Sequence, residues 1–158
     1  MRIKQIYIIN LKRRKDKLKQ IMKSINLIDP DGNIDIEVFD AIDGKIINEE
    51  YLTKNNIKTL EEWTDPFKNT TINCGEIGCS MSHYRVWESI IKNNYNHALI
   101  IEDDASFADD FINKVEKIDI PNNTDLLYFG RKKFTEKEKK YNTQLIYPEF
   151  SYWTIGYY

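Results

Sequence analysis

Three consecutive acidic residues stand directly after an apolar run in the segment ALIIEDDASF, residues 98–107. The run is typical of a buried strand, and adjacent carboxylates at its end repel one another unless water, a cation or cationic side chains compensate them. Side chains alternate along an extended strand, so Glu102 and Asp104 would point to one side and Asp103 to the other. Such a pair of acids can hold a hard divalent cation together with water and phosphate oxygens. A solvated loop of acids is the alternative.

Four basic residues, 12–15, follow the first apolar segment. We expect them in the first turn of a helix, where the helix dipole disfavours cations, so their presence indicates a compensating anion. A nucleotide diphosphate that bridges this corner and a metal at the acids would fill that role, because arginine offers a planar fork to phosphate. A lysine-rich, solvated helix face is the alternative interpretation.

The two cysteines, Cys74 and Cys79, lie close to His83 in the sequence. A zinc site needs further ligands at suitable spacing, so we expect two reduced thiols on or near a helix instead. His83 could contact a ligand, carry a proton or be partly buried with a bond to a backbone carbonyl, and we expect the last of these.

The pattern of apolar residues predicts strands that alternate with helices. Strands are expected at residues 2–11, 34–44, 98–101, 124–130, 143–148 and 151–158, and helices at 11–25, 49–57, 73–94 and 109–118. This order favours an α/β domain with a mostly parallel central sheet flanked by helices. Ligands bind such sheets at the carboxyl ends of the strands, which places the acids beside Asp43 and Gly44 at one rim.

The segment 73–94 is the clearest helix. Asn73 lies three residues before Glu76, which is the spacing of a capping box. An apolar stripe is expected along Ile77, Met81, Tyr84 and Ile91, with Ser80, His83 and Trp87 on an adjacent face.

Composition restricts the function classes. The 158 residues are enough for a single domain, 1–158, and the net charge of −2 provides no basic field for nucleic acid. The apolar run near the N-terminus is too short for a signal peptide, and nothing reaches the length of a transmembrane segment. The default expectation is a cytoplasmic protein.

Taken in order, six segments resemble glycosyltransferase family 25, which contains bacterial lipooligosaccharide galactosyltransferases and procollagen galactosyltransferase-like enzymes. The segments are IYIINLKRRKDKL, AIDG, GEIGCSMSHYRVWESII, ALIIEDD, YFG and YWTIGYY. Each is weak alone, and the ordered set is specific. The resemblance covers most of the chain, except residues 46–71 and the basic loop after Gly130.

The resemblance implies a GT-A type nucleotide-sugar-binding fold and an inverting hexosyltransferase that moves galactose or glucose from a UDP-sugar with Mn²⁺ or Mg²⁺. The acceptor would be a hydroxyl on a glycan or hydroxylysine, as in lipopolysaccharide biosynthesis or collagen-like chains. It implies metal ligation by Asp104 and Glu102 and catalytic roles for Glu102 and Asp103. The implied donor-binding residues are Asn10, Arg13, Asp43, Gly44, Glu76, Ser82, His83 and Asp103.

Members of this family normally continue well beyond the GYY at which this sequence stops, so the resemblance also implies C-terminal truncation. The portion beyond could hold the general base that an inverting transfer requires. Two other functions stay open: an inactive UDP-sugar-binding module, and a receiver-like phosphoryl-transfer domain that uses the acids for Mg²⁺. The second lacks a clear partner lysine at another strand end.

Overall fold

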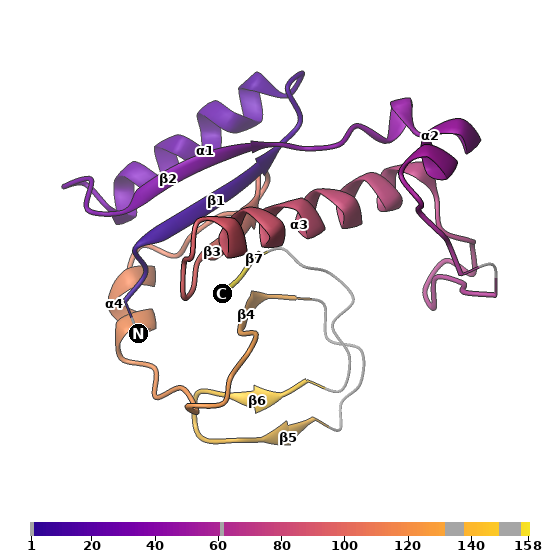
Figure 1. Ribbon diagram of the computed structural model, residues 1–158. Coiled ribbons are helices and arrows are strands. Elements are labelled where there is room, and N and C mark those ends of the chain that lie inside the picture. Colours follow the sequence, from indigo (N-terminus) through magenta and orange to yellow (C-terminus); the bar gives the residue numbers. More distant parts are fainter. Residues whose placement is uncertain (1, 61, 132–137, 149–155) are drawn as a thin grey trace.

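A computed structural model describes residues 2–60, 62–131, 138–148 and 156–158. Its elements confirm the predicted alternation of strands and helices (Figure 1). In chain order they are β1 (Gln5–Asn10), α1 (Lys15–Ile28), β2 (Asp35–Asp40), the 3₁₀ helix η1 (Gly44–Ile46), α2 (Glu49–Lys54), α3 (Cys74–Lys92), β3 (Leu99–Glu102), α4 (Phe111–Glu116), β4 (Tyr128–Gly130), β5 (Lys139–Lys140), β6 (Ile146–Tyr147) and β7 (Gly156–Tyr157).

The central sheet has five strands in the order β2-β1-β3-β7-β4, and β5 and β6 form a separate two-stranded sheet. β1 pairs in parallel with both β2 and β3, whereas β7 lies antiparallel between β3 and β4. The α/β class is therefore confirmed, with a mixed sheet. Most of the predicted strand 151–158, and part of the basic loop after Gly130, lie outside the described residues.

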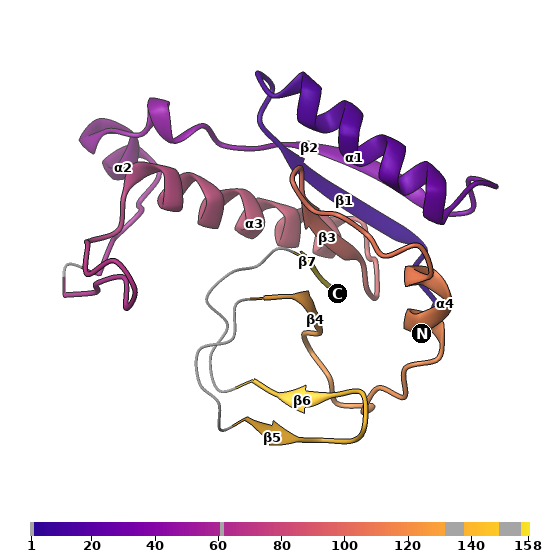
Figure 2. The same cartoon turned by 180° about the vertical axis from the view of Figure 1, so that it is seen from behind.

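Helices cover both faces of the sheet (Figures 1 and 2). Side chains alternate along the strands, so Ile6 and Ile8 of β1 pack with α1 and α4, while Tyr7 and Ile9 pack with Val86 of α3. The core thus has two layers, one on each side of β1 and β3. α2 packs beside the start of α3, through Tyr51 and Leu52, in a third apolar cluster.

The three strands β1, β2 and β3 end at the same edge of the sheet. In the register, Asn10 lies opposite Asp40 and Ile9 opposite Glu102. The loops that follow these strands therefore meet, as the parallel part of the sheet predicts.

Two predictions about helices were wrong in detail. α1 begins at Lys15 with Arg14 at its N-cap position, so residues 12–14 precede the helix instead of forming its first turn. On α3, Tyr84 and Ile91 are 49% and 78% exposed and do not belong to a buried stripe. The buried face instead includes small residues such as Gly78 and Ser82, because the chain after β2 packs closely against it. The capping box of Asn73 and Glu76 is confirmed.

The predicted strand 34–44 ends at Asp40. Beyond it the chain leaves the sheet and turns onto α3, where the hydroxyl of Ser82 accepts a hydrogen bond from the backbone N–H of Ile42 at 2.8 Å. β3 likewise ends at Glu102, and Asp103 and Asp104 lie in a turn. The alternation of side chains expected across these acids therefore stops at Glu102.

Candidate functional site

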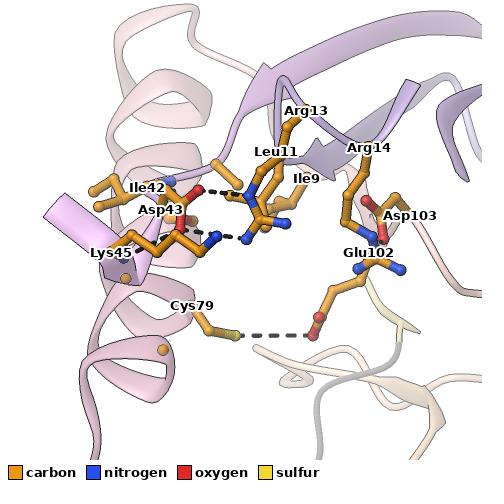
Figure 3. A pocket seen from close by; sticks show the side chains of 14 residues that line it. Ile9, Leu11, Arg13, Arg14, Ile42, Asp43, Lys45, Cys79, Glu102 and Asp103 are labelled. Atoms are coloured by element: carbon orange, nitrogen blue, oxygen red, sulfur yellow. Dashed lines mark hydrogen bonds and ion pairs between the residues drawn. The ribbon is translucent and has the colours of Figure 1, made fainter. Parts of the chain in front are cut away.

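A pocket of about 370 Å³ opens at the edge where β1, β2 and β3 end (Figure 3). Its walls come from the loops after these strands and from the N-terminal half of α3. The lining residues are Ile9, Leu11, Arg13, Arg14, Ala41, Ile42, Asp43, Gly44, Lys45, Gly75, Cys79, Ser82, Glu102 and Asp103.

An exposed ion pair forms one side of the pocket. The Arg13 guanidinium donates from Nε to Asp43 Oδ2 at 2.7 Å and from Nη2 to Asp43 Oδ1 at 3.3 Å. The backbone N–H of Lys45 also donates to Asp43, at 3.1 Å. These hydrogen bonds, that of Arg13 foremost, lower the pKa of Asp43 to about 2. The carboxylate is therefore fixed in its charged form.

A second arginine–aspartate pair forms another part of the pocket wall, and its carboxylate is buried. Arg14 Nη1 lies 3.0 Å from Asp103 Oδ1, and the Asp103 side chain is 5% exposed. Burial raises the pKa of Asp103 because desolvation outweighs the attraction of Arg14, and the neighbouring charges of Asp104 and Glu102 add to the rise. This carboxylate is thus a stronger base than an exposed aspartate.

Glu102 faces α3 from the end of β3. Its Oε1 lies 4.0 Å from Cys79 Sγ and 3.5 Å from His83 Nε2. Desolvation, followed by the charges of Glu102, Asp104 and Glu76, raises the pKa of Cys79 to about 12. Cys79 and Glu102 line the pocket, whereas His83 lies behind them and is buried.

His83 is held by an aromatic network. Its Nδ1 lies 2.8 Å from the hydroxyl of Tyr157, which also accepts a hydrogen bond from the indole N–H of Trp87 at 2.9 Å. The partner of the buried histidine is thus a tyrosine hydroxyl and not the backbone carbonyl that the sequence led us to expect. His83 Nε2 has no hydrogen-bond partner among the described residues.

Close backbone packing places the loop that carries Asp43. A Cβ atom on Gly78 would lie 2.6 Å from the carbonyl oxygen of Ile42, and one on Gly44 would lie 2.6 Å from that of Cys74. Ser82 donates to the carbonyl of Gly78 at 2.6 Å while it accepts from Ile42. Two glycines and a serine therefore let α3 approach this loop, and the Ser82 hydroxyl is committed to that contact.

The pocket has groups that could bind an anion. Two guanidinium groups line it and offer N–H donors beyond those used in the ion pairs, and planar guanidinium groups bind phosphate oxygens well. Carboxylates at the same edge could bind a cation that accompanies the anion.

Comparison with known proteins identifies the family. Residues 3–155 match the family described as Glycosyltransferase family 25 (LPS biosynthesis protein). The chain belongs to glycosyltransferase family 25. Human procollagen galactosyltransferase 2 is 35% identical over 164 residues, which cover 97% of this chain and 25% of that protein. A glycosyltransferase 25 family member of Anopheles gambiae is 33% identical over 162 residues, 98% of this chain and 27% of that protein.

This family 25 chain spans about a quarter of the length of the curated relatives it matches. Five of the six segments that carried the resemblance lie within the described residues, and of the sixth, YWTIGYY, only residues 156–158 are described. The pocket brings together Arg13, Asp43, Gly44, Ser82, Glu102 and Asp103 of the predicted site residues.

Four other predicted residues lie elsewhere in the described part of the family 25 chain. Asn10 is buried and donates to the carbonyl of Leu11, with its Oδ1 lacking a hydrogen-bond partner among the described residues. Glu76 accepts from the backbone N–H of Asn73 as a helix cap. Asp104 is exposed and is not one of the lining residues described, and His83 lies behind the wall.

Cys79 was considered beside His83 and set aside as a zinc ligand for want of further ligands, and Arg14 was not singled out among the four basic residues. Cys79 and His83 are four residues apart on a helix, so they lie on one face, and that spacing was a usable signal. The third member of their cluster, Glu102, is brought by a distant strand, which the spacing of cysteines could not predict. Arg14 is one of four consecutive basic residues. Its position at the N-cap of α1 and its ion pair with Asp103 distinguish it from the other three, and the sequence does not show either feature.

None of the helices in the described residues is both long and apolar enough to span a membrane.

Proposed function

We propose that this chain forms the donor-binding part of an inverting, metal-dependent hexosyltransferase of GT-A type. It would transfer galactose or glucose from a UDP-sugar to a hydroxyl of a glycan or of hydroxylysine. The observation that supports the proposal best is the placement of Arg13 and Arg14 beside Glu102 in one pocket at the carboxyl edge of the sheet. Family membership and the galactosyltransferase names of the relatives support the transfer reaction and the sugar.

The two arginines would bind the diphosphate of the donor. Each is already oriented by an aspartate, Arg13 by Asp43 and Arg14 by Asp103, so little side-chain entropy is lost on binding. Since an ion pair uses only part of the guanidinium's five N–H groups, the others can donate to phosphate oxygens. The ion pairs therefore position the two guanidinium groups and still leave N–H donors for the phosphate oxygens.

Mn²⁺ or Mg²⁺ fits this pocket through Glu102. Such ions take oxygen ligands, keep several waters and are often held by one or two carboxylates plus phosphate oxygens. Glu102 is a pocket-lining carboxylate whose side chain is 33% exposed, whereas Asp103 is engaged by Arg14 and Asp104 faces solvent. When bound, the ion would stabilise the negative charge on the departing diphosphate. We therefore rank Glu102 above Asp104 as its ligand.

The acceptor hydroxyl must lose a proton during an inverting transfer. Asp103 has a raised pKa, but its carboxylate is held by Arg14 inside the wall. Asp103 is therefore not the general base in this proposal. Asp103 acts in this proposal by orienting Arg14.

Calorimetric titration of UDP, UDP-galactose and UDP-glucose into the full chain, with and without Mn²⁺, tests the proposal. We expect Mn²⁺-dependent binding that Glu102→Gln weakens by at least about tenfold, because the variant loses the charge that holds the ion. Asp104→Asn is the matched control and should bind almost as tightly as the unchanged chain.

Release of UDP from the bound donor would then identify a transferase, whereas binding without release would favour the inactive UDP-sugar-binding module. A folded chain that binds none of the three nucleotides in the presence of Mn²⁺ contradicts the proposed site. A larger loss in Asp104→Asn than in Glu102→Gln contradicts the ligand assignment.

A further inference from the structure

A cluster of three potential metal ligands lies at the inner wall of the pocket, beside the proposed diphosphate site. Cys79 and His83 come from successive turns of α3, and Glu102 comes from the end of β3. We propose that these three side chains form a binding site for a zinc-type transition-metal ion. Its sulfur, nitrogen and oxygen ligands differ from the all-oxygen ligands that Mn²⁺ and Mg²⁺ prefer.

The distances suit a tetrahedral ion. Zn²⁺ binds sulfur at about 2.3 Å and nitrogen or oxygen at about 2.0–2.1 Å, so its ligand atoms lie roughly 3.3–3.6 Å from one another. Glu102 Oε1 lies 3.5 Å from His83 Nε2 and 4.0 Å from Cys79 Sγ, and all three ligand atoms lie within 4.8 Å of one another. Small side-chain rotations therefore suffice to close the ligands around an ion.

The orientation of His83 supports a ligand at this position. Its side chain is 7% exposed, and its Nε2 faces Glu102 without a hydrogen-bond partner in the described ranges. A buried polar atom left without a partner is costly, and a bound ion would satisfy it. The other ring nitrogen, Nδ1, lies 2.8 Å from the Tyr157 hydroxyl. Metal-binding histidines characteristically donate their second ring N–H to an oxygen in this way.

Charge also favours a cation here. A thiolate and a carboxylate together balance the two charges of Zn²⁺, and a neutral imidazole completes the ligand set. Asp104 and Glu76 add to the negative potential at Cys79. Cys79 and Glu102 line the pocket, so the fourth position of the ion would open toward it, as in zinc sites that keep one position for water or substrate.

A metal-free explanation exists: Nε2–H of His83 could face the carboxylate of Glu102 as a weak polar contact. That contact does not involve the Cys79 thiol, and it does not explain why all three ligand atoms lie within 4.8 Å of one another. The two explanations differ in what they predict for Cys79, because only the metal site requires its sulfur. Glu102 is common to this site and to the proposed Mn²⁺ site, so bound zinc would oppose Mn²⁺-dependent donor binding.

Titration of the metal-free full chain with Co²⁺ and with Zn²⁺, without nucleotide, tests the site. Co²⁺ should bind one equivalent and produce a thiolate-to-metal charge-transfer band, and Zn²⁺ should displace it. Cys79→Ser should abolish the band and weaken Zn²⁺ binding at least about tenfold, with fewer protons released on binding. Cys74→Ser is the matched control, since that thiol is exposed and outside the cluster, and should behave as the unchanged chain.

Tyr157→Phe keeps all three ligands and removes the hydroxyl that orients His83. Loss of such an outer partner typically weakens metal binding by about 10–100-fold, so the band should persist at a higher Co²⁺ concentration. Absence of one-equivalent binding by the folded chain, or a band that survives Cys79→Ser, would overturn the site. Because no nucleotide is present, this result is independent of whether donor binding occurs.

Discussion

The pocket holds two arginine–aspartate pairs that have similar chemistry and opposite electrostatic outcomes. Arg13 is exposed and Asp43 is partly exposed, and the hydrogen bonds from Arg13 and from the backbone of Lys45 lower the pKa of Asp43. Arg14 and Asp103 are joined at a similar distance, but burial raises the pKa of Asp103. The two carboxyl groups differ in two ways: Asp43 accepts two hydrogen bonds from Arg13, whereas Asp103 is attracted by the charge of Arg14 and is more deeply buried. The sign of the pKa shift therefore depends on whether hydrogen bonds to the carboxylate outweigh its desolvation.

The two sides of the pocket are also built differently. Close backbone contacts with α3, at Gly44 and Gly78, position the loop that carries Asp43. The ion pair of Asp43 with Arg13 takes no part in those contacts. Asp103 comes directly after β3 in the centre of the sheet, where burial follows from the strand itself. We therefore expect the buried pair to matter for folding and the exposed pair to matter mainly for the ligand.

Arg14→Met should give the largest change in stability. It leaves the Asp103 carboxylate buried without its partner, and breaking a buried pair costs about 3–5 kcal/mol. Arg14 is itself 34% exposed, so water can replace part of the interaction, and we expect a loss of about 2 kcal/mol in the free energy of unfolding. Urea denaturation measures this loss.

Two variants make that result specific to the buried pair. Arg13→Met is the matched control on the exposed pair and should leave the urea midpoint almost unchanged. The double variant Arg14→Met with Asp103→Asn removes the buried charge as well and should recover part of the lost stability. Equal losses in Arg13→Met and Arg14→Met would remove the proposed difference between the pairs.

Local sequence patterns predict part of this site correctly. The strand before Glu102, the capping box at Asn73 and the meeting of the loops at one edge follow from local patterns, and all three are confirmed. The pairing of each arginine with its aspartate does not follow, because it depends on α1 beginning at Lys15 and on β3 ending at Glu102. A shift of a few residues at either boundary changes which side chains meet.

Close packing explains the main error on α3. Hydrophobic periodicity grouped Tyr84 and Ile91 into one apolar stripe with Ile77 and Met81, yet both are exposed and the helix packs through Gly78 and Ser82. Small residues carry little hydrophobic signal, although they permit the shortest backbone approach. A metal site at Cys79 and His83 was set aside because the nearby sequence holds no further ligand, and Glu102, the third member of the cluster, comes from an element distant in the chain.

Gly78→Ala should have the second largest effect on stability. It should disturb the loop that carries Asp43 and leave the Arg14–Asp103 pair unchanged. Alanine normally stabilises a helix by about 1 kcal/mol relative to glycine. Here its Cβ would lie 2.6 Å from the carbonyl oxygen of Ile42, so the backbone must move, and overpacking of this kind costs about 1–3 kcal/mol. We expect a net loss of stability in urea and a weaker affinity for UDP.

Ser80→Ala on the exposed side of α3 is the control for helix propensity. It should raise stability slightly, because alanine is the better helix former. If Gly78→Ala also raises stability, the close contact does not place the Asp43 loop, and the proposed difference between the two sides of the pocket would be wrong.

The smallest expected effect is on the acid dependence of stability, and it separates the pairs by sign. Asp43 has a folded pKa of about 2, below the value of about 3.9 for an unfolded chain, so its contribution is present above about pH 4 and is lost as pH falls toward 2. Asp103 has a raised folded pKa, so its contribution decreases as pH rises through its titration. Urea midpoints between about pH 5 and pH 3 should therefore depend less steeply on pH in Asp43→Asn and more steeply in Asp103→Asn. Parallel slopes in the two variants would mean that the pairs titrate alike, and that burial does not distinguish them.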